Sequence, residues 1–81
     1  MGGKKNQYKD IKLNKSQQRI FDYLFEHKSI TSMEAIENFG ETRLGARIFE
    51  MRKKGINISS EMVEVVNRYK EKRHVKRYYL G

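Results

Sequence analysis

The stretch TSMEAIENFGETRLGARIFEMRKKG, residues 31–55, decides the fold of this 81-residue chain. Thr31 is a good helix N-cap, and Glu34 stands three residues later, where the partner of a capping box belongs. Apolar residues at helical spacing follow, and Gly40 stands where a residue with positive φ commonly closes a helix. The pattern predicts a helix that begins at Thr31 and ends at Gly40.

A second helix is predicted directly after that turn. Glu41 and Thr42 open it, and Gly55 closes it after lysines in the last turn. At about 100° per residue, its core stripe consists of Leu44, Ile48 and Met51. The side chains that then point away from the core are Thr42, Ala46, Phe49 and Lys53. Of these, Phe49 is either an exposed contact for DNA or a partner protein, or part of the core rim, and the core rim is the favoured interpretation. A helix, a tight turn and a second helix form a helix-turn-helix.

A further helix is predicted upstream of this pair. Asn14 is its N-cap, and Gln17 occupies the capping-box position. Its apolar stripe consists of Ile20, Phe21, Leu24 and Phe25. The residues Ser29-Ile30 are expected to form a short extended link to the next helix.

Residues 1–12 are interpreted as a flexible basic arm. Tyr8 and Ile11 are its only residues suited to packing. The folded domain is therefore expected to span residues 13–81.

After Gly55 the hydrophobic period changes from helical to alternating. Residues 56–58 alternate and 62–66 are rich in β-branched side chains, so a strand is predicted there, and a second over 75–80. The polar residues 67–73 between them are expected to form a hairpin loop. The predicted fold class is α+β, with three helices followed by a two-stranded β-hairpin. The residues expected to be largely buried are Ile20, Leu24, Ile36, Leu44, Ile48, Ile58 and Leu80.

The composition restricts the function. Lys and Arg total 18 against 10 acidic residues, a formal net charge of +8, which favours a polyanionic partner such as DNA, RNA or an anionic membrane surface. The chain has no cysteine, which excludes disulfides and thiolate metal sites. No apolar run approaches the roughly 18 residues that span a membrane. His27 and His74 lack neighbours at ligand spacing, so a non-enzyme without metal or cofactor is expected.

The order of elements resembles the winged helix-turn-helix superfamily over residues 14–80. The residues that carry the resemblance are Thr31 to Phe39, the run from Arg43 to Ile48, Met51 to Gly55, and the closing Lys76 to Leu80. It is most similar to small helix-turn-helix domains of phages and bacteria. The resemblance implies that the third helix lies in the DNA major groove and that the hairpin is a wing on the DNA backbone.

Candidate contacts follow from this expectation. Arg43, in the first turn of the third helix, is the strongest base-reading candidate, because arginine pairs bidentately with guanine. Thr42 is a second candidate, and Ala46 is a third because it can meet a thymine methyl group. Arg47 is expected to reach a phosphate or to pair with Glu34 or Glu50. The residues expected on the DNA backbone are Arg47, Lys53, Arg68, Lys70, Lys72, Arg73 and Lys76.

Three functions are weighed. The first is a cytoplasmic, sequence-specific binder of double-stranded DNA from a bacterium or phage, acting as a transcriptional regulator or an accessory DNA-architecture factor. The alternative is a winged-helix protein-interaction module. The third is a sequence-tolerant binder of RNA or single strands that stacks bases on Tyr69, Tyr78 and Tyr79. It ranks last because alternating strand packing explains the tyrosines better. A homodimer or a cooperative array on DNA is left open.

Overall fold

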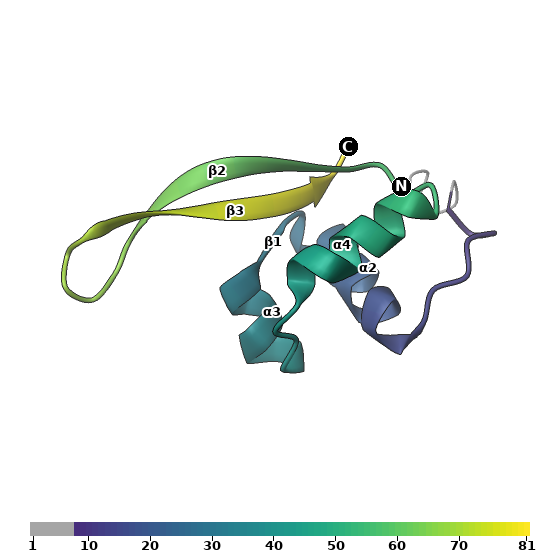
Figure 1. Cartoon of the computed structure of the whole chain (residues 1–81), viewed down its shortest axis with the longest axis horizontal. Coiled ribbons are helices and arrows are strands. Elements are labelled where there is room, and N and C mark those ends of the chain that lie inside the picture. Colours follow the sequence, from purple (N-terminus) through teal and green to yellow (C-terminus); the bar gives the residue numbers. More distant parts are fainter. Residues whose placement is uncertain (1–7) are drawn as a thin grey trace.

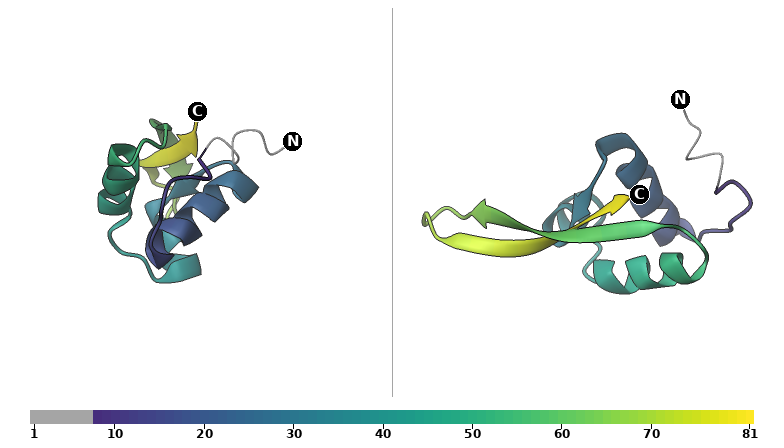
Figure 2. Two further views of the ribbon diagram at one scale, coloured as in Figure 1. Left: turned by 90° about the vertical axis from the view of Figure 1, so that its right-hand side faces the viewer. Right: turned by 90° about the horizontal axis from the view of Figure 1, so that it is seen from above.

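A computed structural model describes residues 8–81 (Figure 1). In this part of the chain the elements are α2 (Lys15–His27), β1 (Ile30–Thr31), α3 (Ser32–Phe39), α4 (Leu44–Lys53), β2 (Ile58–Val66) and β3 (Lys72–Leu80). The predicted order of three helices followed by a β-hairpin is confirmed, and the fold class is α+β. The hairpin projects beyond the packed helices (Figures 1 and 2), which gives a longest dimension of 45 Å.

The two predicted capping boxes are present. The side chain of Asn14 accepts a hydrogen bond from the backbone N–H of Gln17, and the Gln17 side chain accepts one in return from the backbone N–H of Asn14. Thr31 and Glu34 exchange the same pair of bonds at the start of α3. Gly40 ends α3 in the left-handed conformation, at φ 67°. These short-range signals therefore fix where α2 and α3 begin and where α3 ends.

The helix α4 begins later than expected. Its N-cap is Arg43, whose φ of −123° and ψ of 48° are not helical, so Thr42 and Arg43 precede the helix. The prediction that Arg43 lies in the first turn was wrong. The carboxylate of Glu41 accepts a hydrogen bond from the Arg43 backbone N–H at 3.0 Å, which holds these residues in a turn and delays the helix to Leu44.

The sheet has three strands rather than two, in the order β1-β3-β2. The expected link at Ile30 is strand β1, which pairs antiparallel with β3 at Tyr78 and Arg77. Strands β2 and β3 pair over their whole lengths, from Ile58 opposite Leu80 to Val66 opposite Lys72. Both strands are continuous, and the loop covers residues 67–71 instead of the predicted 67–73. Strand pairing extends into the end of that polar segment.

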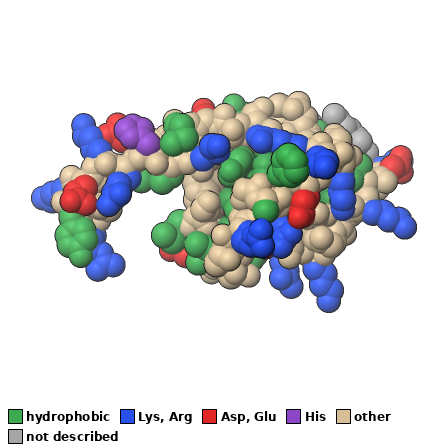
Figure 3. Space-filling model, in the orientation of Figure 1, with side chains coloured by type: hydrophobic (Ala, Val, Ile, Leu, Met, Phe, Trp, Pro, Cys, Tyr) green, Lys and Arg blue, Asp and Glu red, His purple; other side chains and the backbone are tan. Residues whose placement is uncertain are grey.

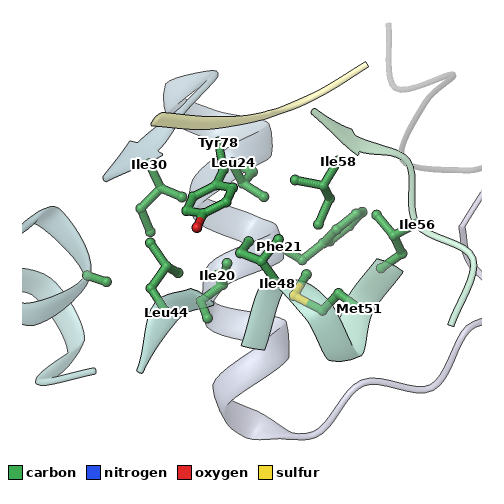
Figure 4. Packing of buried hydrophobic residues seen from close by; sticks show 11 residues of the cluster. Ile20, Phe21, Leu24, Ile30, Leu44, Ile48, Met51, Ile56, Ile58 and Tyr78 are labelled. Carbon is green, nitrogen blue, oxygen red and sulfur yellow. The ribbon is translucent and has the colours of Figure 1, made fainter. Parts of the chain in front are cut away.

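The core lies between the helices and the base of the sheet (Figure 4). Its buried residues are Ile20, Phe21, Leu24, Ile30, Ala35, Leu44, Ile48, Met51, Ile56, Ile58 and Tyr78. Leu80 is half-buried at its edge. Ile36 was predicted to be buried and is 43% exposed. The short helix α3 meets the core through Ala35 and Phe39, which turns Ile36 toward the hairpin.

Residues 8–13 lie against the folded domain. Tyr8 packs edge-on against Phe21, and Ile11 packs against the core near Gly55. The Tyr8 hydroxyl accepts a hydrogen bond from the backbone N–H of Asn57. The expected basic arm is thus packed from residue 8 onward, and residues 1–7 lie outside the described residues. Within residues 8–81, no helix is long and apolar enough to cross a membrane.

Candidate nucleic-acid interface

The outward side of α4 is free of the core, as its sequence pattern predicts. Lys53 is exposed and Ala46 is half-exposed, opposite the buried stripe of this helix, and Thr42 is exposed in the turn before it. Phe49 is 60% exposed, so its expected place at the rim of the core was wrong. The Lys53 ammonium lies 5.3 Å from the centroid of the Phe49 ring. A large apolar ring with a cation above it therefore stands near the middle of an open helix face.

One flank of α4 is attached to the sheet. Arg52 Nε donates a hydrogen bond of 2.9 Å to the backbone oxygen of Ile58, and its guanidinium lies 5.9 Å from the centroid of the Tyr78 ring. A Cβ atom on Gly45 would lie 3.7 Å from the Tyr78 hydroxyl, which is ordinary contact. Sequence reasoning missed Arg52 because its partners lie on strands and only the tertiary fold brings them close.

The other flank holds Arg47 in an ion-pair network. Arg47 donates to Glu50 at 2.9 Å and its Nε lies 3.5 Å from a Glu41 oxygen, so the hypothesis of a pair with Glu50 is confirmed, and Glu34 is not involved. The hydrogen bond to Glu50 and its charge raise the pKa of Arg47. Hydrogen bonds from Gln17 and Arg47 lower the pKa of the Glu50 carboxyl, and the bond from Gln17 has the larger effect. Arg47 therefore braces the turn before α4.

Gln17 joins this network to α2. It is buried, donates to Glu50 Oε1 at 2.9 Å and accepts from Lys54 Nζ at 2.7 Å. The capping-box spacing pointed to Gln17, but no signal in the sequence relates it to a residue 33 positions away. The buried amide of Gln17 thus forms hydrogen bonds that link α2 to α4, and these bonds fix the packing of the two helices against each other.

Arg43 stands exposed at the start of α4. Its backbone is held by Glu41, while its side chain forms no ion pair with any described residue. Its guanidinium is therefore available at the end of the helix, although it does not extend from a helical turn.

The hairpin tip is ordered by its own backbone. The Asn67 side chain accepts hydrogen bonds from the backbone N–H groups of Tyr69 and Glu71. The backbone N–H of Lys70 donates a hydrogen bond to the backbone oxygen of Asn67, and Lys70 adopts a left-handed φ of 64°. Arg68 and Lys70 are thus presented at the tip, exposed and without an ion pair inside the 8–81 segment.

The structure does not bring all the expected wing cations to one surface. Because side chains alternate along a strand, Lys72 and Lys76 share one face of β3 and Arg73 lies on the other. Lys72 lies 3.6 Å from Glu64, and Arg73 lies 3.9 Å from Glu71, both pairs being exposed. Lys76 has no ion pair in the described part of the chain.

Figure 3 shows one broad face of the molecule. Lysine and arginine side chains gather there over the helical body and again at the end of the projecting hairpin. The same face carries apolar side chains between the cations. An elongated polyanion laid across it would meet positive charge at both ends.

The structure also shows where the tyrosines considered for base stacking and the two histidines lie. Tyr78 is buried, which contradicts its proposed use as a stacking platform for bases. Tyr69 is 74% exposed at the hairpin tip. The rings of His27 and Tyr23 stack at 4.3 Å, whereas His74 is exposed on β3. Among residues 8–81 no group of three potential metal ligands is found.

Comparison with known proteins agrees with this architecture. The profile of a family described as a winged helix-turn-helix domain matches residues 15–81, which cover α2 through β3. No curated protein and no solved structure matches the chain. A winged helix-turn-helix domain points to DNA binding as the general activity. The match covers most of the sequence, and the chain therefore belongs to the family of winged helix-turn-helix domains.

Proposed function

We propose that this protein binds double-stranded DNA at specific sequences, with α4 in the major groove and the hairpin along the backbone. One observation carries the proposal: the open side of α4 and the charged hairpin tip occur together on one face. The 45 Å long axis corresponds to about 13 base pairs at about 3.4 Å each. Duplexes of about 20 base pairs are therefore long enough for the whole contact.

The base contacts are expected from the outward side of α4 and from the turn before it. Arg43 has the free guanidinium that pairs with a guanine edge, and Thr42 is exposed beside it. Ala46 and Phe49 add apolar contacts, for which the thymine methyl group is the matching feature of the major groove. We therefore expect a site that contains both a guanine and a thymine contact.

Backbone contacts are expected from cations of α4 and the hairpin. Lys53, Arg68, Lys70 and Lys76 form no ion pair within the described residues. Lys72 is also expected to contact a phosphate. Breaking its exposed ion pair with Glu64 costs little, because such pairs contribute only about 0–1 kcal/mol. Arg47 stays with Glu41 and Glu50 in this scheme.

The resemblance to small phage and bacterial domains supports a role as a transcriptional regulator or an accessory DNA-architecture factor in the cytoplasm. Such roles need only selective occupation of a DNA site. Binding as a homodimer or a cooperative array remains part of this proposal.

The test is a selection from random duplexes at two salt concentrations, repeated with Arg43→Ala and Phe49→Ala. We expect one enriched motif for the wild type. Arg43→Ala should lose about 1–3 kcal/mol of discrimination at one base pair, and Phe49→Ala should lose its preference at a thymine. Arg19→Ala, on the exposed side of α2, is the control and should keep the motif. An enriched motif that neither α4 variant alters would contradict the proposed readout, and absence of duplex binding would contradict the function.

A further inference from the structure

Glu41 lies in the turn that joins α3 to α4, and its backbone belongs to the end of α3. The backbone N–H of Glu41 donates a hydrogen bond of 3.2 Å to the backbone oxygen of Ala35, a buried residue of that helix. The preceding Gly40 donates its own N–H to the backbone oxygen of Ile36. These bonds satisfy carbonyl groups at the end of α3 and fix the position of Glu41.

The side chain of Glu41 extends in the other direction, toward α4. One carboxylate oxygen accepts a hydrogen bond from the backbone N–H of Arg43 at 3.0 Å, and the other oxygen lies 3.5 Å from Nε of Arg47. Only 14% of the Glu41 side chain is exposed. Arg47 is also paired with Glu50 within α4. The single carboxylate of Glu41 thus ties the end of α3 to the start of α4.

The direction of the Arg43 side chain depends on this carboxylate. Asn14 and Thr31 cap their helices through their own side chains, whereas Arg43, the N-cap of α4, forms no such bond. Its backbone angles, φ −123° and ψ 48°, are not helical, and they determine where its Cβ points. The hydrogen bond from Arg43 to Glu41 is therefore the side-chain contact that holds this backbone in place.

We propose that Glu41 contributes to sequence specificity by positioning Arg43 at the base that it reads. The inference rests on the proposed function, because Glu41 acts only through the base contact of Arg43. Arginine pairs bidentately with guanine only when two of its donors align with O6 and N7 of the base. A carboxylate that fixes the backbone of this arginine therefore raises discrimination without touching DNA. Its negative charge acts on phosphates, which carry no sequence information.

A double-mutant cycle measures the coupling between the two residues. Wild type, Glu41→Ala, Arg43→Ala and the double variant are titrated by fluorescence anisotropy with two duplexes. One is the selected site, and the other differs only at the guanine pair assigned to Arg43. The ratio of the two dissociation constants is the discrimination. Because both duplexes bind the same folded molecules, a loss of stability alone leaves this ratio unchanged.

The expected losses are specific to one background. Arg43→Ala should lower the discrimination about 5- to 150-fold, and Glu41→Ala should lower it about fivefold, because the guanidinium is still present but less well aligned. In the Arg43→Ala background, Glu41→Ala should cause no further loss. The control is Glu37→Ala, which removes the same charge from the exposed surface of α3 and should keep the wild-type ratio.

The cycle also separates this inference from the proposed function. If Arg43→Ala loses discrimination and Glu41→Ala keeps it, the role of Glu41 is overturned and the base contact stands. Equal losses from Glu41→Ala in both backgrounds, or from Glu41→Ala and Glu37→Ala, would also overturn it, since the effect would not pass through Arg43. Unchanged discrimination in Arg43→Ala would refute the base contact, and the role of Glu41 with it.

Discussion

Removal of the two cations at the hairpin tip should flatten the salt dependence of DNA binding. Arg68 and Lys70 are exposed, lack ion pairs within the described residues, and are held at the end of the hairpin by the Asn67 turn. Arg68→Ala combined with Lys70→Ala removes both charges and leaves the turn side chain of Asn67 intact. Each lost phosphate contact lowers the steepness of log affinity against log salt by about 0.9.

The magnitude follows from the five cations proposed to contact the DNA backbone, which are Lys53, Arg68, Lys70, Lys72 and Lys76. Five phosphate contacts give a slope of about −4.5, which is a loss of about 500-fold in affinity between 50 and 200 mM salt. Three remaining contacts give about −2.7, a loss of about 40-fold over the same range. The double variant should also weaken binding to cognate and scrambled duplexes equally, because phosphates carry no sequence information.

The assay is a fluorescence-anisotropy titration at several salt concentrations. The control is Lys15→Ala combined with Arg19→Ala on the exposed side of α2, which removes the same net charge from residues outside the proposed DNA contact. It should retain the slope of about −4.5. If both double variants flatten the slope equally, net charge alone governs binding. If neither does, the hairpin tip does not touch the backbone.

Three further outcomes test the fold. Ile48→Ala, at a fully buried position of α4, should cost about 2–5 kcal/mol in urea unfolding, and a loss below about 1 kcal/mol would contradict its place in the core. Lys28→Gly should raise the unfolding free energy by about 1 kcal/mol, because Lys28 caps α2 at φ 76°, whereas Lys28→Ala should give no gain. Glu50→Gln should destabilise the domain at pH 7. Because the folded state lowers the pKa of Glu50 from 4.5, the stabilisation it provides is present above that value and is lost as the pH falls through the folded pKa. The two unfolding curves should therefore converge in acid, and a constant difference down to pH 3 would refute a role for the ionised carboxylate.

Part of the fold could be predicted from the sequence because its signals are local. The capping boxes at Asn14 and Thr31 need only residues three positions away, and Gly40 needs only its own freedom at positive φ. The helical and alternating periods likewise predicted which side of α4 is open and that a hairpin follows. Net charge and element order then pointed to a polyanionic partner.

The candidate site was only partly predictable, because its geometry depends on contacts between distant segments. Arg47 offered either a phosphate contact or an internal pair, and Gln17 offered only a cap. The fold places Glu41 and Glu50 beside Arg47, and the packing of α2 against α4 brings Gln17 to within 2.9 Å of Glu50. Helical spacing pointed Phe49 away from the core, whereas its apolar side chain suggested the core rim, and the fold leaves it exposed.

The sequence by itself therefore determined the caps, the helical stripes, the hairpin and the basic character, since each depends on neighbours a few residues apart. Tertiary structure alone decided that Ile30 and Thr31 form a strand, because a strand exists only with its partner, which lies almost fifty residues later at Arg77 and Tyr78. It also decided that Ile36 faces the hairpin. Burial is a property of what packs opposite a side chain, and the chain supplies that only when it folds.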